Sequence, residues 1–268
     1  MTGGAPRTGS GDRRPIFSPR LYAFSCGWQI GPLKGAEGGE VRVPVPVYLI
    51  EHQDQTILVD TGVHPDMRSD AKSRIGWVAD FIKTDLPAGQ DLGGHLERLG
   101  KPPGELDLVV NTHLHYDHCG GNELLPAGTK VMVQRSEWAA AHDAAEIEAN
   151  HYGPADFDGH GHEIVEVDGE HDLFGDGSVV LLPTFGHTPG HQSVLLRAES
   201  GDVVLCADAC YFLPWIDTEE SPPHGRDKEE ELQSLRRLRA LRDGGARLIP
   251  GHDSAFWETL PQAPEQAA

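Results

Sequence analysis

Short apolar runs separated by polar turns make up most of this chain, and this pattern predicts many short β-strands. Apolar and β-branched runs that end at Gly, Pro, Asn or Asp are typical of buried strands. Such runs occupy residues 41–52, 55–62, 105–113, 129–134, 162–169, 177–187, 191–208 and 246–252. Pro44 and Pro46 have no amide hydrogen to donate to a neighbouring strand. We therefore expect the first of these strands to begin as an edge strand or as an irregular segment.

Two segments are predicted to be longer helices. In residues 227–245, acidic residues lie near the start and arginines near the end, which suits a helix dipole, and Gly244 or Gly245 is expected to end the helix. Its apolar stripe consists of Leu232, Leu235, Leu238 and Leu241. Residues 136–151 are rich in alanine, so we predict another helix there, with Ser136 as its N-cap.

Residues 64–100 carry a weaker helical pattern. Apolar residues recur at helical spacings, at Ile75, Trp77, Val78, Phe81 and Ile82. This spacing predicts one or two short helices. The aromatic side chains of Trp77 and Phe81 would usually pack into a core, but a segment in this position could equally form the wall of a pocket.

The charge of the chain narrows the classes of function. With 22 basic and 42 acidic residues, the net charge is −20. Such a surface repels phosphate backbones and anionic lipids, so we expect no nucleic-acid partner and no membrane partner. No apolar stretch is long enough to predict a transmembrane helix. The charge itself indicates little about the substrate.

The cysteines and the N-terminus indicate a cytoplasmic protein. The cysteines at 26, 119, 206 and 210 form no CxxC pair, which favours reduced thiols over disulfides. Residues 1–20 include basic residues but no apolar core of a signal peptide. We predict a flexible tail over 1–20 and a single domain over 21–268, as a monomer or a homodimer.

The stretch NTHLHYDHCGGN, residues 111–122, concentrates four potential metal ligands in six positions. His113 and His115 are two residues apart, so both imidazoles lie on one side of an extended segment. Asp117 and His118 follow after the chain turns and approach the same point from another direction. Four ligands so close together suit two adjacent metal ions better than one.

Three other apolar runs also end near a residue that can bind a metal, at His187, Asp208 and His252. Because loops at strand ends bring distant residues together at one edge of a sheet, we expect all seven side chains to form one site. Five imidazoles and two carboxylates suit zinc, with iron, manganese or cobalt as alternatives. A shared carboxylate would hold two ions about 3.5–4 Å apart, and the pair would lower the pKa of a shared water.

The motifs HLHYDH, GHTPGH, ADAC and PGHD, with VDTG upstream, are similar to those of the metallo-β-lactamase superfamily. The likeness runs over nearly all of the chain after the tail. It implies an α/β fold, an αβ/βα four-layer sandwich of two mixed β-sheets with external helices and a dinuclear site at one edge. It also implies how the ligands divide: His113, His115 and His187 for one ion, Asp117, His118 and His252 for the other, and Asp208 as the bridge.

Two further residues are expected to support the ligands. The resemblance implies that Asp60 of VDTG is a buried carboxylate beside the site. His191 could itself be a ligand, but it lies four residues after His187 with Pro189 between them, which favours a supporting contact.

Within the superfamily the chain resembles the N-acyl-homoserine lactone lactonases, the quorum-quenching enzymes, in PVYLIEH, VQRSEWAAA, GHTPGHQSVLL and DACY. The resemblance implies that a hydroxide bridging two zinc ions opens a lactone ring. It implies that Asp117 orients this hydroxide and passes its proton to the leaving group, and that Tyr211 hydrogen-bonds the lactone carbonyl. Tyr211 could instead be a packed aromatic beside Phe212. Residues 64–100 and 212–230 depart from the pattern of that family, so the acyl-chain preference stays open.

Three other activities fit the same ligand pattern. One is a lactonase for another ring, similar to pyridoxolactonases. Another is a thioesterase similar to glyoxalase II, for which basic residues are expected around the pocket, and the chain has none between Asp208 and Arg226. The third is an iron-dependent redox enzyme, and those with a di-iron centre normally carry a fused flavin domain for which this chain has no room.

Overall fold

Two β-sheets form the centre of the molecule. The computed structural model describes residues 18–32, 39–222 and 224–268. Within them, one sheet has the strand order β4-β1-β2-β3-β5-β6-β7 and the other the order β12-β11-β10-β9-β8. The strands are β1 (Arg20–Pro32), β2 (Glu40–His52), β3 (Gln55–Val59), β4 (Lys83–Asp85), β5 (Leu108–Val110), β6 (Lys130–Gln134), β7 (Glu163–Val167), β8 (His171–Asp172), β9 (Val179–Pro183), β10 (Gln192–Ala198), β11 (Gly201–Ala207) and β12 (Arg247–Pro250).

Both sheets are mixed. In the larger sheet, β4, β1, β2 and β3 pair antiparallel, whereas β3, β5, β6 and β7 run parallel. In the smaller sheet, β8 to β11 pair antiparallel and β12 lies parallel to β11. Two mixed sheets are the arrangement that the sequence motifs predicted.

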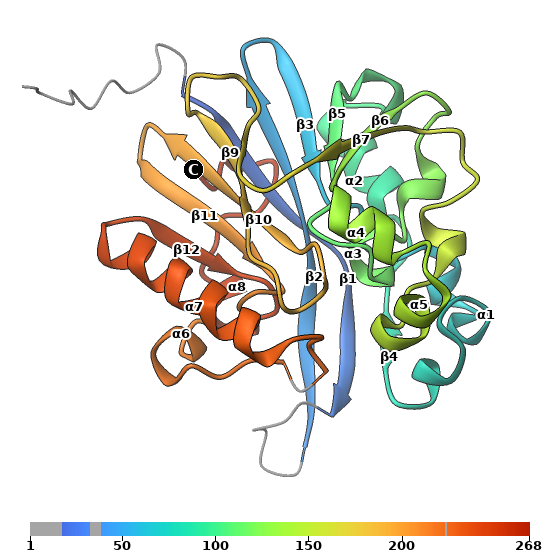
Figure 1. Ribbon diagram of the computed structural model, residues 1–268. Helices are drawn as coiled ribbons and strands as arrows, with labels where there is room; N and C mark the ends of the chain where they lie inside the picture. The colour runs from blue at the N-terminus through green and yellow to red at the C-terminus, as the bar shows by residue number, and fades with distance from the viewer. Residues whose placement is uncertain (1–17, 33–38, 223) are drawn as a thin grey trace, which may run out of the picture.

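The two sheets pack face to face, and helices lie on their outer sides (Figure 1). The core between the sheets includes Leu21, Ile50, Ile57, Val110, Leu181, Leu196, Leu205 and Ile249. On the outer face of the smaller sheet, α7 buries Leu235 and Leu238, and on the outer face of the larger sheet α2 buries Leu92 and Leu96. The predicted four-layer αβ/βα sandwich is therefore confirmed.

The helices of the described residues are mostly short. They are α1 (Ala71–Ile75), α2 (Leu92–Leu99), α3 (Tyr116–Cys119), α4 (Arg135–Ala140), α5 (Ala144–Asn150), α6 (Trp215–Thr218), α7 (Lys228–Asp243) and α8 (Ser254–Trp257). The 3₁₀ turns are η1 (Pro65–Arg68), η2 (Gly76–Asp80), η3 (Pro103–Glu105), η4 (Asn122–Leu124) and η5 (Pro154–Asp156). The helix predicted over 227–245 is confirmed as α7: Asp227 caps its start, and Gly244 follows its last turn.

The single helix predicted over 136–151 is wrong, because the segment forms two helices. Ser136 is not an N-cap: α4 begins one residue earlier, and Gln134, at the cap position, makes no side-chain cap bond. The side chain of Asp143 accepts hydrogen bonds from the amides of Ala145 and Glu146. These bonds start a new helix at that point, because a short acidic side chain competes for backbone amides.

The sequence pattern missed β1 and described β2 correctly. A bulge between Ser25 and Trp28 shifts the register of β1 against β2, which breaks the alternation that marks a strand. β2 is regular, but it pairs with β3 only from Tyr48 onward. At Pro44 and Pro46, β2 therefore pairs with β1 on one side and is not paired with β3 on the other. This is the position expected for prolines in an edge segment.

Other predictions are only partly tested. Residues 1–17, most of the predicted tail, lie outside the described residues, and β1 begins at Arg20. All four cysteines are buried and free, which agrees with reduced thiols. In the described part of the chain, no helix is both long and apolar enough to cross a membrane. The single domain and the oligomeric state stay predictions.

Candidate metal centre

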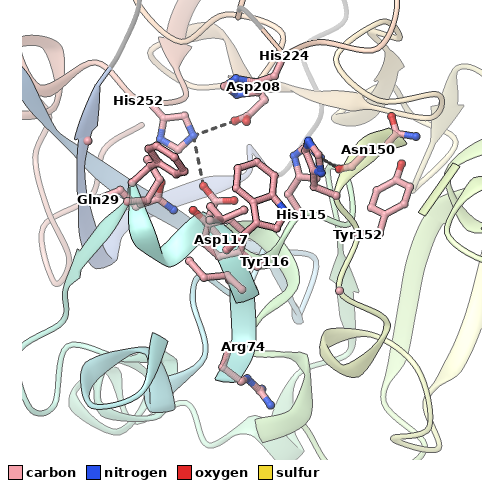
Figure 2. A pocket seen from close by; sticks show the side chains of 18 of the residues that line it. Gln29, Arg74, His115, Tyr116, Asp117, Asn150, Tyr152, Asp208, His224 and His252 are labelled. Atoms are coloured by element: carbon pink, nitrogen blue, oxygen red, sulfur yellow. Dashed lines mark hydrogen bonds and ion pairs between the residues drawn. The ribbon is translucent and has the colours of Figure 1, made fainter. Parts of the chain in front are cut away.

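The seven predicted ligands meet at one edge of the sandwich, in two adjoining clusters. His113, His187, Asp208 and His252 follow the ends of β5, β9, β11 and β12. His113, His115, His187 and Asp208 form one cluster, and Asp117, His118 and His252 form the other, with the ligand atoms of each within 4.8 Å of one another. Figure 2 shows Asp117, Asp208 and His252 pointing toward one another.

In the first cluster, three imidazole nitrogens and one carboxylate oxygen converge. Nδ1 of His115 lies 3.0 Å from Nε2 of His113 and 3.1 Å from Nε2 of His187. Oδ2 of Asp208 lies 3.1 Å from His187 Nε2 and 3.7 Å from His113 Nε2. Neutral imidazole nitrogens at such distances need a shared cation or proton between them, and one proton could satisfy only one of the contacts to His115.

The second cluster uses the other oxygen of Asp208. Its Oδ1 lies 3.1 Å from Nε2 of His118 and 3.1 Å from Nε2 of His252. Oδ2 of Asp117 lies 3.8 Å from the same nitrogen of His118 and 3.7 Å from that of His252. One carboxylate therefore faces both clusters, an oxygen to each.

Parallel pairing of β11 and β12 places Asp208 beside His252. Ala207 has a left-handed backbone (φ 44°), so the chain turns sharply at the end of β11. The backbone of Gly251 comes so close that a Cβ there would lie 2.5 Å from the carbonyl oxygen of Ala207. Only glycine allows this approach, which sets the two ligands side by side.

Outer contacts fix which nitrogen of each ring faces inward. Nε2 of His115 lies 2.8 Å from the carbonyl oxygen of Asn150, Nδ1 of His118 lies 2.8 Å from Asp60 Oδ2, and Nδ1 of His252 lies 2.9 Å from the carbonyl oxygen of Pro44. Each of these partners accepts a proton, so the opposite nitrogen keeps its lone pair.

The donor set fits two cations. Nε2 of His118 and Oδ1 of Asp208 are buried 3.1 Å apart, and within the described residues their polar contacts are to members of the two clusters. Burial lowers the pKa of His113 and of His115 well below the ordinary value, so both rings are neutral. Burial also opposes charge on His118, but the nearby carboxylates of Asp208 and Asp117 outweigh it and raise its pKa. The neutral imidazoles of His113 and His115, beside the carboxylate charge of Asp208 and Asp117, form an environment that a divalent metal ion satisfies.

Asp60 has the supporting position that was expected of it. It has a left-handed backbone (φ 61°) after β3. Its Oδ1 accepts the amide of Thr112, and its Oδ2 accepts the Thr112 hydroxyl and Nδ1 of His118. The Thr112 hydroxyl also lies 3.1 Å from Nδ1 of His113, so Asp60 orients a ligand in each cluster. Burial raises the pKa of this carboxyl, and these donors partly offset the rise.

His191 also supports a ligand. Its Nε2 accepts the backbone amide of Asp208 at 3.0 Å, while its Nδ1 lies 3.0 Å from the carbonyl oxygen of Thr184. Burial, followed by the proximity of His187, lowers its pKa to about 3, so the ring is neutral and can accept. It belongs to neither ligand cluster.

The sequence pattern gave no indication of Glu137, a fully buried carboxylate on α4. Oε1 accepts the Leu114 amide and the Tyr152 hydroxyl, and Oε2 accepts the Thr188 hydroxyl and the Gly190 amide. Leu114 lies between two ligands of the first cluster, and Thr188 directly follows the third. Glu137 thus joins two ligand loops that are far apart in sequence.

A cavity of about 570 Å³ opens onto the two clusters. Tyr211 lines it, with its ring centroid 4.7 Å from that of His252, and it also stacks on Trp215. Its Oη lies 3.4 Å from Nε2 of His224, a residue that was not singled out from the sequence.

The one or two short helices predicted in residues 64–100 correspond to α1 and η2, and the structure adds η1 and α2 in the same range. Trp77 and Phe81 are not core residues. Each is 59% exposed, and both line the cavity. Their segment lies beside the metal centre, outside the sandwich, so they form a pocket wall, which was the other expectation. Ile75, Val78 and Ile82 line the cavity with them.

Comparison with known proteins agrees with this geometry. Residues 41–252 match the model of the metallo-beta-lactamase superfamily. The chain is 31% identical to the N-acyl homoserine lactonase AttM of Rhizobium johnstonii (85% of this chain, 89% of that protein). It is 33% identical to the N-acyl homoserine lactonase AiiA of Bacillus thuringiensis subsp. kurstaki (76% and 78%). A solved N-acyl homoserine lactone hydrolase, with the product N-hexanoyl-L-homoserine at its catalytic metal center, superimposes with a TM-score of 0.81 at 29% identity (94% and 100%). The chain belongs to the metallo-β-lactamase superfamily.

Proposed function

We propose that this protein is a dinuclear zinc hydrolase that opens the lactone ring of N-acyl-homoserine lactones. The observation that carries the proposal is the position of Asp208, which presents one oxygen to each cluster, with the phenol of Tyr211 beside both. The named activity of the relatives AttM and AiiA supports the choice of substrate.

The roles of the chain's own residues follow from their positions. A metal pair held by these residues would supply Lewis acidity and hydroxide near neutral pH. Asp117 lies 3.7 Å from His252 at the cavity, where its carboxylate can accept the proton of the attacking hydroxide and pass it to the leaving alkoxide. Burial and the nearby Asp208 raise the pKa of Tyr211, so its phenol stays protonated and can donate to the carbonyl oxygen as negative charge develops there.

We also propose zinc as the cation and the cytoplasm as the location. Imidazole and carboxylate ligands without a thiolate suit zinc, and His and Asp are the residues of both clusters. The four free, buried cysteines suit a reducing compartment.

A panel of lactones, assayed on a sample whose metal content is measured, tests the proposal. We expect about two zinc ions per chain and opening of N-acyl-homoserine lactones at near-neutral pH. Chelation should abolish the activity, and added zinc should restore it. A protein that holds two metal ions and opens no lactone would contradict the proposal.

Replacing Tyr211 by Phe should leave both metal ions bound and slow ring opening by about 10- to 100-fold, because one hydrogen bond to the developing oxyanion is lost. The measurement is kcat with metal content on the same sample. Tyr48→Phe is the matched control, since that phenol lies in the core, has no hydrogen-bond partner among the described residues and should be dispensable. An unchanged rate in Tyr211→Phe would show that the Tyr211 hydroxyl has no role in ring opening and that the side chain only packs.

A further inference from the structure

The phenol of Tyr211 has a polar neighbour in the cavity, the imidazole of His224. Oη of Tyr211 lies 3.4 Å from Nε2 of His224, and both side chains line the cavity. The centroids of the two rings are 6.4 Å apart and the rings are tilted by 59°, so they meet through these polar atoms and do not stack. Figure 2 shows His224 at the same end of the cavity as Asp208 and His252. Long hydrogen bonds of this kind are common at catalytic groups in the absence of substrate.

The loop that carries His224 is fixed beside the metal centre. The amide of Arg226 donates to the carbonyl oxygen of His187 at 3.1 Å, and the amide of Asp227 donates to that of the residue before His187 at 2.8 Å. On the other side, the guanidinium of Arg226 makes two hydrogen bonds to the carboxylate of Glu146 on α5, at 3.0 and 2.9 Å. The backbone next to His224 is therefore tied to a ligand loop and to a second wall of the cavity.

The single hydrogen of a phenol decides which of the two groups donates. Burial, followed by the charges of Asp208 and Asp117, raises the pKa of Tyr211, so the phenol keeps its hydrogen. When Tyr211 donates this hydrogen to a substrate, its oxygen is left as an acceptor for His224. Burial lowers the pKa of His224, so its ring is neutral and has one N–H, which in this arrangement is on Nε2.

This hydrogen bond supplies something that the packing of Tyr211 does not. Stacking on Trp215 and contact with the ring of His252 hold the phenol ring, but neither contact sets the direction of its hydroxyl hydrogen. An N–H that donates to the phenol oxygen turns the hydroxyl hydrogen away from His224. It also makes the hydroxyl a stronger donor, because hydrogen bonds in a chain polarise one another.

We propose that His224 is a positioning residue for ring opening, whose Nε2–H donates to Oη of Tyr211 and directs the phenol hydrogen to the carbonyl oxygen of the substrate. The proposal rests on the lactonase function proposed above and on the role of Tyr211 in it. Because His224 acts through Tyr211 on the charge that develops during the reaction, its loss should slow the chemical step and leave substrate binding unchanged.

The test is a double-mutant cycle of His224→Phe and Tyr211→Phe, with kcat and KM for an N-acyl-homoserine lactone and the metal content measured on each enzyme. Phe keeps a ring at position 224 and removes the donor. We expect His224→Phe to lower kcat by about 3- to 10-fold with little change in KM or metal content. In the Tyr211→Phe background, the same replacement should cause no further loss. His224→Gln, whose amide keeps a donor, should recover most of the rate.

His142→Phe is the matched control, because His142 is an exposed histidine outside the lining of the cavity. Its kcat should equal that of the wild type. If the wild type opens the lactone and His224→Phe is equally fast, the role of His224 is refuted while the lactonase function stands. Losses that add up in the double variant would show that His224 acts without Tyr211, which also refutes the proposal. If the wild type opens no lactone, the function and the role of His224 both fail.

Discussion

Replacing Asp208 by Asn is expected to remove the metal pair and to lower kcat/KM by about 10³-fold or more. The carboxylate presents one oxygen to each cluster, with Oδ2 toward His187 and Oδ1 toward His118 and His252. Asn keeps the volume but carries no charge, and its NH₂ group must face one cluster as a donor where a lone pair is needed. We expect fewer than two metal ions per chain by elemental analysis, together with loss of ring opening.

Asp202→Asn provides the control, because Asp202 lies exposed near the other end of the same strand, β11. That variant should keep its metal content and its activity. Two tightly bound ions in Asp208→Asn would show that the clusters bind metal independently, and the shared carboxylate would then lose its proposed role.

The candidate ligands could be predicted from the sequence because residue type and position in the chain both indicate them. Each distant ligand follows an apolar run, and strand ends are brought together at one edge of a sheet. The sequence also places three histidines and an aspartate close together, at His113, His115, Asp117 and His118. Such a concentration of metal-binding residue types is typical of a metal site. Residue type and position agree at each of these sites, and the fold brings all of these side chains into two clusters with metal-binding geometry.

The supports of these ligands could not be predicted in the same way. His115 and His252 are oriented by the backbone carbonyls of Asn150 and Pro44, and any residue offers a carbonyl. Trp77 and Phe81 have the spacing of core residues, and only the placement of their segment outside the sandwich exposes them.

Glu137→Leu is expected to lower the free energy of unfolding by about 2–6 kcal/mol, because the amides of Leu114 and Gly190 lose their acceptor inside the protein at about 1–3 kcal/mol each. The hydroxyls of Thr188 and Tyr152 can rotate to other partners, so they contribute less. Thermal unfolding of the metal-free protein measures the change, with a decrease in Tm of roughly 10 °C. Glu97→Leu is the control, since Glu97 lies exposed on α2 and its replacement should change stability by less than about 0.5 kcal/mol.

Metal retention separates a positioning role of Glu137 from a purely structural one. Glu137 holds the backbone between His113 and His115 and the loop that follows His187, so its loss should loosen all three imidazoles of the first cluster while leaving Asp117 and His252 in place. Titration with a chelator well below the Tm should then show one ion released about 10- to 100-fold more readily than in the wild type, and the other retained. A less stable protein with unchanged affinity for both ions would mean that Glu137 stabilises the fold without setting the geometry of the ligands.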